Sequence, residues 1–282
     1  MKMTSMIMSS PLYFDVAYAI NPHMLDPSGN LNKIDKDLAR SEWQALKDKF
    51  EFLGFPVRLL EGTPDLPDFV FCANTFFAWD DGKKKCAILS NMLSEKRRPE
   101  VLLAEEWLKQ QGLEILIIPP QYNFEAMGDL IWNLESNSLY LGHGFRTDAA
   151  TVSFLQKLLP YPITALELVD QHFYHLDTCF FTLNKECAAY VPDAFSLPSQ
   201  QIIKDHFPVA IEISRHEALE CFAGNAFCPD GKNVIMHPGA VELRTRLDSL
   251  GFQTHELDTS EFMKSGGSVF CLKNFIAENQ AP

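Results

Sequence analysis

The 282-residue sequence lacks the signatures of nucleotide and metal chemistry. Both glycine-rich phosphate-binding patterns, GxGxxG and GxxxxGK[ST], are absent, so nucleotide-dependent chemistry is not expected. The seven cysteines are an odd number, and they form no CxxC pair and no tight cluster with histidine. This pattern indicates neither a disulfide framework nor a zinc site.

Long hydrophobic runs are also missing. No segment approaches the roughly 20 apolar residues that a membrane-spanning helix needs. The first residues, MKMTSMIMSS, lack the continuous apolar stretch and the small-residue cleavage site of a signal peptide. We therefore expect a cytoplasmic protein with no membrane partner, in which the thiols stay free.

Positive charge is scarce, because 24 Lys and Arg residues stand against 37 Asp and Glu residues, for a net charge of -13. Nucleic acids and anionic membranes select basic patches, so neither is an expected partner. A small cationic substrate is compatible with this charge. No low-complexity segment or Pro/Gly/Ser-rich linker divides the chain, and 46% of the residues are hydrophobic. We expect one domain over residues 1–282 and leave a homo-oligomer open.

Alternating helix and strand patterns predict a mixed α/β fold. Residues 35–53 place apolar side chains at helical spacing with charges between them, which predicts an amphipathic helix. Further helical patterns cover 97–112, 149–159, 239–250 and 259–264. Short apolar runs predict strands at 68–73, 86–90, 114–119, 129–133, 138–142, 179–183, 209–213 and 233–237. The helix spacing fits a cyclic repeat of small β-rich units, and an open doubly wound sheet is the alternative.

The segment KSGGSVFC near the C-terminus is the first candidate for chemistry. Gly266 and Gly267 permit a tight turn and a close approach of a ligand to the main chain ahead of Cys271. A cysteine carried by such a turn can face a cavity and act as a nucleophile. The alternative is a structural cysteine in the core, which is the more common state of a free cysteine.

A second candidate lies in the segment FYHLDTCF. His175 and Asp177 are two residues apart, so they share one face if the segment is extended. An acid beside a histidine suits a site in which the carboxylate holds a cation while the imidazole transfers protons near neutral pH. Taken alone, the pattern is more often a hydrogen-bonded pair on the surface.

Two further segments supply charged side chains. FEAMGD carries Glu125 and Asp129 on a loop that enters a predicted strand, and GHGFRT contains Arg146. The acids could help a cavity to hold a positive charge, and Arg146 could bind a carboxylate through two parallel hydrogen bonds. The simpler interpretation of all three is a solvated loop residue.

Together these motifs resemble those of the pentein superfamily of guanidino-modifying enzymes, which includes arginine deiminases, dimethylarginine hydrolases and amidinotransferases. The matching segments follow the family order over most of the chain: FDVAYAINPHM, PDFVFCANTFF, FEAMGD, YLGHGFRTD, FYHLDTCF, FAGNAF and KSGGSVFCL. The segments FCANT, FYHLDTCF and KSGGSVFCL look closest to the catalytic domain of the bacterial arginine dihydrolases. The resemblance implies an α/β propeller of five ββαβ units around a central active-site cavity.

The resemblance also implies roles for nine residues. Cys271 would attack the guanidinium carbon to give a thiouronium adduct, with His175 as general acid and then general base. Glu125 and Asp177 would hold the guanidinium nitrogens, and Arg146 would bind the substrate α-carboxylate. The other implied pocket residues are Asn21, Asn74, Asp129 and Asn225. Deiminases use an aspartate where this sequence has asparagine 74, and an asparagine there is associated with cleavage of a second C–N bond.

The sequence departs from the family pattern in three places. Ala126 and Met127 replace smaller or more polar residues of the usual FEGxGD, which would narrow or dry one wall of the pocket. Asn91 stands where relatives often have a second arginine for the α-carboxylate, so Arg97 or Arg98 could replace it, or the substrate could lack that group. The phenylalanine directly before the nucleophile is bulkier than expected.

The leading hypothesis is an arginine dihydrolase that forms ornithine, ammonia and CO2 without a metal or organic cofactor. A guanidinium ion has a pKa above roughly 12, so oriented carboxylates must hold its charge while a thiolate attacks its carbon. A dimethylarginine hydrolase or an arginine deiminase, each giving citrulline, is the next hypothesis, and an amidinotransferase follows. A non-catalytic binding module of the same fold is the alternative from a different class.

Overall fold

Five separate β-sheets organise the described part of the chain, which is residues 1–278 of a computed structural model. The largest sheet has the order β1 (Lys2–Met3), β15 (Ile276–Glu278), β4 (Phe76–Asp80), β5 (Lys85–Leu89) and β6 (Glu114–Ile117). The three-stranded sheets are β7 (Leu130–Asn133), β8 (Ser138–His143) and β9 (Ile163–Glu167), and β10 (Phe180–Thr182), β11 (Cys187–Tyr190) and β12 (Val209–Glu212). The other two sheets pair β2 (Met6–Ser9) with β3 (Val57–Leu60), and β13 (Asn233–Met236) with β14 (Gln253–Glu256).

Every sheet contains the same connection, in which a strand leads through a helix to a parallel partner. The parallel pairs are β2 and β3, β5 and β6, β8 and β9, β11 and β12, and β13 and β14. The connecting helices are α1 (Lys36–Phe52), α2 (Arg98–Gln110), α4 (Ala149–Leu158), α5 (Leu197–His206) and α7 (Val241–Ser249). An antiparallel hairpin precedes the helix in three sheets, and in the other two the first strand makes a single antiparallel bridge, from Ile7 to Asn274 and from Ile235 to Phe227.

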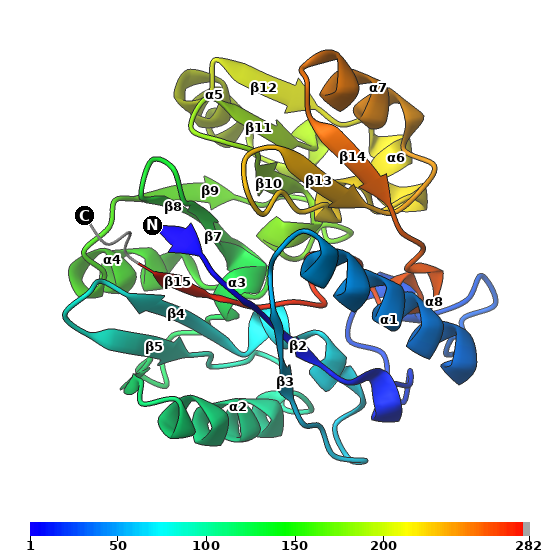
Figure 1. Cartoon of the computed structure of the whole chain (residues 1–282), viewed down its shortest axis with the longest axis vertical. Coiled ribbons are helices and arrows are strands. Elements are labelled where there is room, and N and C mark those ends of the chain that lie inside the picture. The colour runs from blue at the N-terminus through cyan, green and yellow to red at the C-terminus, as the bar shows by residue number, and fades with distance from the viewer. Residues whose placement is uncertain (279–282) are drawn as a thin grey trace.

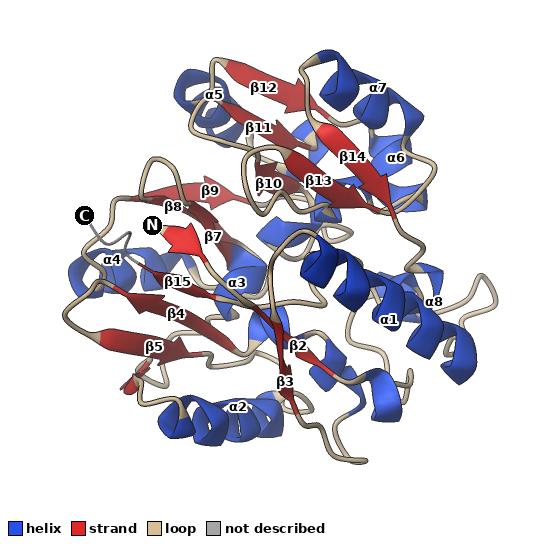
Figure 2. Ribbon diagram, viewed as in Figure 1, coloured by secondary structure: helices blue, strands red, loops and turns tan. Residues whose placement is uncertain are grey.

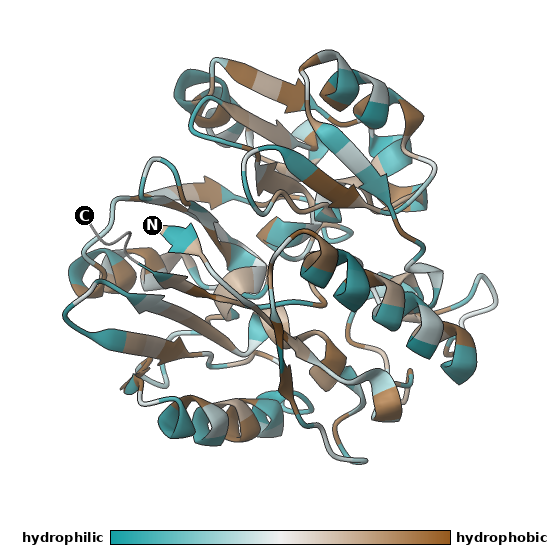
Figure 3. Ribbon diagram, viewed as in Figure 1, coloured by the Kyte–Doolittle hydropathy of each residue, from teal (hydrophilic) through white to brown (hydrophobic). Residues whose placement is uncertain are grey.

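The connecting helices lie on the outer side of the strands, as Figures 1 and 2 show. The hydrophobic residues gather mainly in the strands, whereas the helices alternate hydrophilic and hydrophobic stretches (Figure 3). Three short helices, α3 (Ala126–Asp129), α6 (Arg215–Glu220) and α8 (Ser260–Met263), belong to the loops between the units. Within residues 1–278, no helix has both the length and the apolar character that crossing a bilayer requires.

Helix α1 illustrates how the sequence specifies these elements. Asp35 caps the helix, because its side chain accepts hydrogen bonds from the backbone N–H groups two and three residues ahead. Its buried face includes Trp43, Leu46 and Phe50, which recur at the 3.6-residue period and join the main hydrophobic core. This face anchors the helix over β2 and β3, so the predicted helix at 35–53 is confirmed.

The mixed α/β class and most of the predicted elements are confirmed. The other predicted helices correspond to α2, α4, α7 and α8, and seven of the eight predicted strands correspond to β5, β6, β7, β8, β10, β12 and β13. The sequence patterns missed strands such as β14, whose residues QTHE include no aliphatic or aromatic core side chain. Closure of the five units into a propeller stays a prediction.

The predicted strand at 68–73 is wrong. This segment forms two buried 3-10 turns, Pro67–Val70 and Cys72–Asn74. An apolar run fits a buried strand and a buried turn equally well, because burial alone explains its composition. Proline at the first position of the first turn favours the turn, since it brings no backbone N–H to a sheet. The turns bring Asp68 and Asn74 to the internal cavity described below.

The anchoring of α1 can be tested with two leucines of the same helix. Leu46 is 0% exposed, and Leu46→Ala should lower the free energy of unfolding by about 2 to 5 kcal/mol because it leaves a cavity in the core. Leu38 is 41% exposed, so Leu38→Ala should change the same quantity by less than about 0.5 kcal/mol. Urea unfolding followed by circular dichroism measures both, and equal losses would contradict the core assignment.

Candidate active site

A narrow internal cavity of about 20 Å³ collects side chains from distant parts of the sequence. Its lining residues are Ile20, Asn21, Met24, Asp68, Phe71, Asn74, Arg97, Arg146, Tyr174, His175, Ser265, Gly266, Gly267 and Cys271. Five of the nine predicted site residues are therefore among the lining residues, including both Cys271 and His175. The other four are buried next to the cavity, and their contacts are described below.

Cys271 is held in a polar but enclosed environment. Its Sγ donates to Oδ2 of Asp177 at 3.1 Å and accepts from Nδ2 of Asn225 at 3.2 Å. Burial raises the pKa of the Cys271 thiol well above its ordinary value, and the carboxylate of Asp177 raises this pKa further. The thiol therefore needs a nearby positive charge before it can act as a thiolate.

Asn225 fixes the turn that carries the cysteine. Its Oδ1 accepts the backbone N–H groups of Ser268 at 3.0 Å, Phe270 at 3.1 Å and Cys271 at 3.4 Å. Its Nδ2 also donates to the backbone carbonyl of Asp177 at 2.6 Å. One side-chain amide thus joins the Cys271 turn to the Asp177 turn. The substrate contact predicted for Asn225 stays a prediction.

His175 faces the cavity with a buried carboxylate as its partner. Its Nε2 lies 2.7 Å from Oε2 of Glu125, and Arg146 approaches the same oxygen at 3.4 Å. Burial alone would raise the pKa of Glu125, but the hydrogen bond and charge of His175 and the charge of Arg146 lower it to about 2. Glu125 is therefore an anion at neutral pH, and its hydrogen bond orients the imidazole of His175.

His175 and Asp177 would share one face only if their segment were extended, and this condition is not met. His175 has extended backbone angles, with φ -124° and ψ 153°, but residues Leu176–Thr178 form a 3-10 turn. The turn directs Asp177 to Cys271, while His175 faces Glu125. Burial raises the pKa of Asp177 to about 7, although the hydrogen bond from Cys271 opposes this rise. Oδ1 of Asp177 has no hydrogen-bond partner within the described residues.

The side-chain amide of Asn74 has a defined orientation. Its Oδ1 accepts from the Arg97 guanidinium at 3.0 Å, and a guanidinium has only donors, so the oxygen of the amide must face Arg97. The Nδ2 group is buried and has no partner in the part of the chain that the structure describes. A side chain at Gly128 would collide with this Nδ2 and contact His175, so the amide nitrogen lies near both residues. Asn74 therefore has an unused hydrogen-bond donor near His175, and both residues line the cavity.

Arg97 supports the cavity wall through several partners. Its guanidinium donates to both carboxylate oxygens of Glu100, to Oδ1 of Asn74 and to the backbone carbonyls of residues 68 and 71. Burial opposes its charge, but the ion pair with Glu100 raises the pKa of Arg97 above its ordinary value. Because each of its three nitrogens already donates to a protein group, this geometry gives no support to Arg97 as a replacement for the second carboxylate-binding arginine.

Arg146 still has free donors. One NH group donates to the carbonyl of Ile20 at 2.7 Å, and the guanidinium carbon lies 4.8 Å from the ring centroid of Tyr174. Asn91 is not among the cavity residues, and its amide donates to the backbone carbonyl of Tyr122 at 2.8 Å. Arg98 donates to a backbone carbonyl outside the cavity. Arg146 is therefore the better placed of these residues for an anionic substrate group.

Asp129 connects the segments that carry Glu125 and His175. Its Oδ1 accepts the backbone N–H of Leu176 at 3.0 Å, and its Oδ2 accepts the hydroxyl of Thr147 at 2.7 Å. The Thr147 hydroxyl in turn accepts the backbone N–H of Glu125 at 3.1 Å. Burial raises the pKa of Asp129 to about 7. The substrate contact predicted for Asp129 stays a prediction, since both of its oxygens here hold protein groups.

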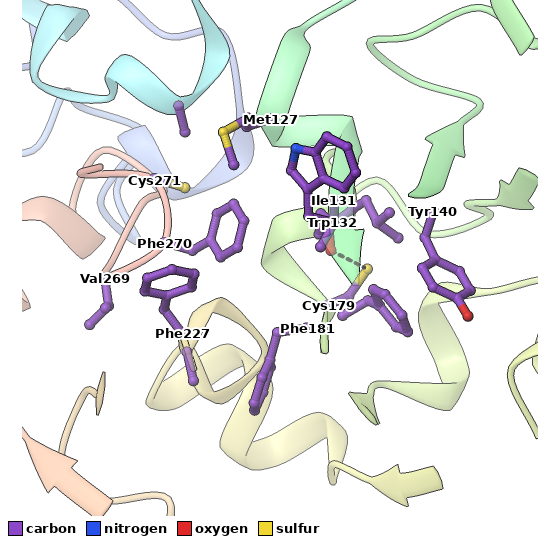
Figure 4. Packing of buried hydrophobic residues seen from close by; sticks show 14 of the residues in the cluster. Met127, Ile131, Trp132, Tyr140, Cys179, Phe181, Phe227, Val269, Phe270 and Cys271 are labelled. Atoms are coloured by element: carbon purple, nitrogen blue, oxygen red, sulfur yellow. Dashed lines mark hydrogen bonds between the residues drawn. The ribbon is translucent and has the colours of Figure 1, made fainter. Parts of the chain in front are cut away.

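Two residues that depart from the family pattern, Met127 and Phe270, lie at a second cavity of about 370 Å³. Met127 and Phe270 line this larger cavity together with Trp132 and Phe227, and neither lines the narrow one. Figure 4 shows Met127 and Phe270 on the same side of Cys271 as Trp132. Neither Ala126 nor Met127 lines the narrow cavity, so the expectation that they narrow or dry one of its walls is wrong. The side chains of Met127 and Phe270 instead belong to the lining of the larger cavity.

Two further cavity residues escaped the sequence analysis. Asp68 is buried, with Oδ1 accepting from Ser265 at 3.2 Å and Oδ2 without a partner in residues 1–278. The hydroxyl of Tyr174 donates to the backbone carbonyl of Gly266 at 2.7 Å. The sequence feature that could have pointed to them is a polar group next to large apolar residues: the carboxyl of Asp68 in PDFVF and the phenol of Tyr174 in FYH.

Comparison with known proteins gives the same family as these motifs. The N(G),N(G)-dimethylarginine dimethylaminohydrolase of Mycobacterium tuberculosis is 34% identical over 94% of this chain and 83% of its own length. The bifunctional arginine dihydrolase/ornithine cyclodeaminase AgrE of a Nostoc species is 33% identical over 96% of this chain, which spans 38% of that protein. The substrate-bound N-terminal domain of ArgZ, a cyanobacterial arginine dihydrolase, superposes with a TM-score of 0.90 at 29% identity, covering 97% of this chain and 98% of that domain.

The class that these relatives define is that of hydrolases acting on guanidino C–N bonds. The chain belongs to the N,N dimethylarginine dimethylhydrolase family, whose eukaryotic family model matches residues 10–278. The resemblance to guanidino-modifying enzymes that the motifs carry is thereby confirmed.

Alanine substitutions at two glycines test the tight packing of the turn that carries Cys271. A methyl group at Gly266 would lie 2.6 Å from the Tyr174 hydroxyl and 2.8 Å from Oδ1 of Asn21, whereas one at Gly251 meets no atom within 4 Å. Both glycines have positive φ, +90° and +88°, so both alanine variants bear the same backbone strain. Gly266→Ala should therefore lower the free energy of unfolding by at least about 1 kcal/mol more than Gly251→Ala. Urea unfolding measures this difference, and equal effects would contradict the described packing.

Proposed function

We propose that the chain hydrolyses arginine to ornithine, CO2 and two molecules of ammonia, with Cys271 as nucleophile. The observation that supports this most strongly is the cavity shared by Cys271 and His175, each of which has its own buried carboxylate partner. The likeness to ArgZ and AgrE, which are named as arginine dihydrolases, supports the same substrate. The overall reaction consumes two water molecules.

The first half of the reaction begins when the guanidinium ion binds beside Asp177. Its charge offsets the repulsion between the Asp177 carboxylate and the developing thiolate, so the proton of Cys271 can pass to His175. The sulfur attacks the guanidinium carbon, and His175 protonates the nitrogen that leaves as ammonia. A thiouronium adduct remains on Cys271.

His175 then acts as a base. It takes a proton from water, the resulting hydroxide attacks the adduct carbon, and the C–S bond breaks to leave a ureido group. The same two steps repeated at the ureido carbon release the second ammonia and form a carbamate, which loses CO2 to give ornithine. The carboxylate of Glu125 holds the imidazole in position through its hydrogen bond in both rounds.

Asn74 suits the second round because of the atom that it presents. Oδ1 of its amide is bound to Arg97, so Nδ2 is the group available to a ligand. An amide N–H can donate to a ureido oxygen, whereas an aspartate would offer only another acceptor. This difference gives a physical reason for the association between an asparagine at this position and cleavage of a second bond.

The substrate would be held at its other end by Arg146, whose remaining donors suit a carboxylate. We assign Asn21 to the same wall, where its Nδ2 donates to the carbonyl of Ser265 at 3.0 Å. A cavity of about 20 Å³ has room for about one water molecule. Binding of arginine therefore requires its walls to move apart.

We further propose that residues 1–282 form one domain in which the five strand–helix–strand units close into a propeller around the cavity. The fivefold repetition of the connection and the spread of the cavity residues along the chain support this arrangement. We place the protein in the cytoplasm, where its seven free cysteines would remain reduced. Its partner would be a small guanidino compound, and a homo-oligomer stays open.

A second candidate function is hydrolysis of dimethylarginine to citrulline and dimethylamine. The family model and the relative from Mycobacterium tuberculosis favour it. It would use the same nucleophile, and the reaction would end after one bond. A deiminase would stop at the same product, an amidinotransferase would pass the adduct to an amine, and a non-catalytic binding module would form no adduct at Cys271.

Product analysis separates these functions. The purified chain incubated with L-arginine and no added metal should form ornithine with two equivalents of ammonia, and Cys271→Ala should be inactive. Parallel incubation with dimethylarginine tests the second candidate through release of dimethylamine. Citrulline as the end product from arginine would reject the dihydrolase assignment, and no turnover of any guanidino compound would favour the binding module.

Asn74→Asp should stop the reaction after the first bond. The added carboxylate still accepts from a guanidinium ion but offers no donor to the ureido group, so citrulline should accumulate and the rate of ornithine formation should fall by about 10²-fold or more. Asn91→Asp, which changes an asparagine outside the cavity, is the matched control and should still give ornithine. Chromatography of the amino acids over time distinguishes the outcomes, and ornithine formation unchanged by Asn74→Asp would refute the donor role.

Asp177 should set the low-pH side of the activity profile. Burial raises the pKa of its carboxyl to about 7, so below this pH the group is protonated in the free enzyme and cannot hold a cation. The value of kcat/KM for arginine should therefore rise with pH up to about 7. Asp177→Asn should lose this dependence together with about 10²-fold or more of kcat/KM, while Asp193→Asn, at an exposed turn, should keep both. A wild-type profile that is flat from pH 5 to 8 would contradict this role.

A further inference from the structure

Lys273 is an internal cation two residues beyond the proposed nucleophile. Its side chain is 0% exposed, and its Nζ has no hydrogen-bond partner within residues 1–278. A buried ammonium without a polar partner strongly disfavours folding unless other groups hold its charge. The narrow cavity does not include this residue, so a direct contact with substrate is not the explanation.

Three aromatic rings surround this ammonium. Nζ lies 3.1 Å from the ring centroid of Phe270, 4.1 Å from that of Phe227 and 5.2 Å from that of Phe275. The faces of aromatic rings attract cations, most strongly where water is excluded. Figure 4 shows Phe227 and Phe270 next to each other, close to the turn that carries Cys271, and their rings meet edge to face with centroids 5.5 Å apart. These three rings, here called the phenylalanine box, hold the charge without cancelling it as a carboxylate would.

The groups that attract Lys273 belong mainly to the reaction centre. Asp177, Cys72 and Cys271 each favour its charged form, although burial lowers the pKa of Lys273 to about 7. Lys273 in turn favours the ionised form of Asp177, as does Arg97 from the other wall. The Cys72 thiol points to backbone carbonyls of residues 7 and 272 and is not among the cavity residues.

The reaction requires two negative groups in one place. The Cys271 thiolate must form 3.1 Å from Oδ2 of Asp177, and buried like charges at this distance oppose each other. A bound guanidinium ion relieves the repulsion only while it remains a cation. In the second round of the proposed reaction the substrate group is a neutral ureido group, so the substrate no longer supplies that charge.

We propose that Lys273 is a positioning residue whose ammonium, held in the phenylalanine box, sustains the Cys271 thiolate beside the Asp177 carboxylate when no substrate cation is present. This ammonium belongs to the protein and stays behind the substrate cavity in both rounds, whereas the guanidinium charge is lost after the first round. This inference deepens the proposed function, because it explains how one thiol attacks first a cationic and then a neutral carbon.

The test measures the ionisation of Cys271 without any turnover. Substrate-free enzyme is alkylated with iodoacetamide at several pH values, and mass spectrometry of the peptide that contains residue 271 gives the rate at this thiol alone. Lys273→Met, which removes the charge and keeps an apolar chain, should raise the pH midpoint of alkylation by about one unit or more. Lys273→Arg, which keeps the charge, should stay within about 0.3 units of the wild type.

Two further measurements keep the outcomes distinct. Phe227→Leu keeps the lysine but removes one ring of the phenylalanine box, so it should raise the pH midpoint of alkylation by a smaller amount. If circular dichroism shows that Lys273→Met does not fold, Phe227→Leu is the variant that tests the proposal. With arginine as substrate, Lys273→Met should also accumulate citrulline relative to ornithine. An unchanged midpoint in the folded variants would overturn the proposal. Failure of the wild type to turn over arginine would instead overturn the proposed function, and the alkylation result would still stand.

Discussion

The buried contact between Sγ of Cys271 and Oδ2 of Asp177, at 3.1 Å, is the interaction on which the rest of the site depends. It places a thiol with a raised pKa beside a carboxylate with a raised pKa, so neither group ionises easily while the other is charged. A positive charge resolves this conflict. The arrangement therefore favours a cationic ligand, and in the proposed function the same positive charge allows Cys271 to act as a nucleophile.

The surrounding polar groups hold the two sides of this contact in place. Asn225 binds the Cys271 turn through three backbone N–H groups and the Asp177 turn through one carbonyl. On the other side of the cavity, Glu125 fixes the imidazole of His175. The donor-only guanidinium of Arg97 fixes the orientation of the Asn74 amide, so in the proposed function an aspartate at this position would replace a donor with an acceptor.

The sequence predicted elements with strong periodicity, such as helix α1, and it identified the cavity residues that lie in recognisable motifs, such as Cys271 and His175. The prediction from sequence failed where a segment is apolar because it is buried and shows no helical or strand periodicity. The apolar run at 68–73 was predicted as a strand but folds as two turns that carry Asp68 and Asn74. The sequence also could not predict that Asp177 and His175 turn to different partners, because a 3-10 turn between them depends on tertiary contacts. Lys273 gave only the signal of a lysine in an apolar segment, and its environment of three rings is assembled from distant residues.

The most direct test of the central claim is the mass of the intact protein quenched during turnover of arginine. Covalent catalysis by Cys271 predicts a species heavier than the free chain by one arginine less one ammonia, with the added mass on the peptide that contains residue 271. Turnover of arginine with no adduct on that peptide, or with an adduct on another cysteine, would contradict it.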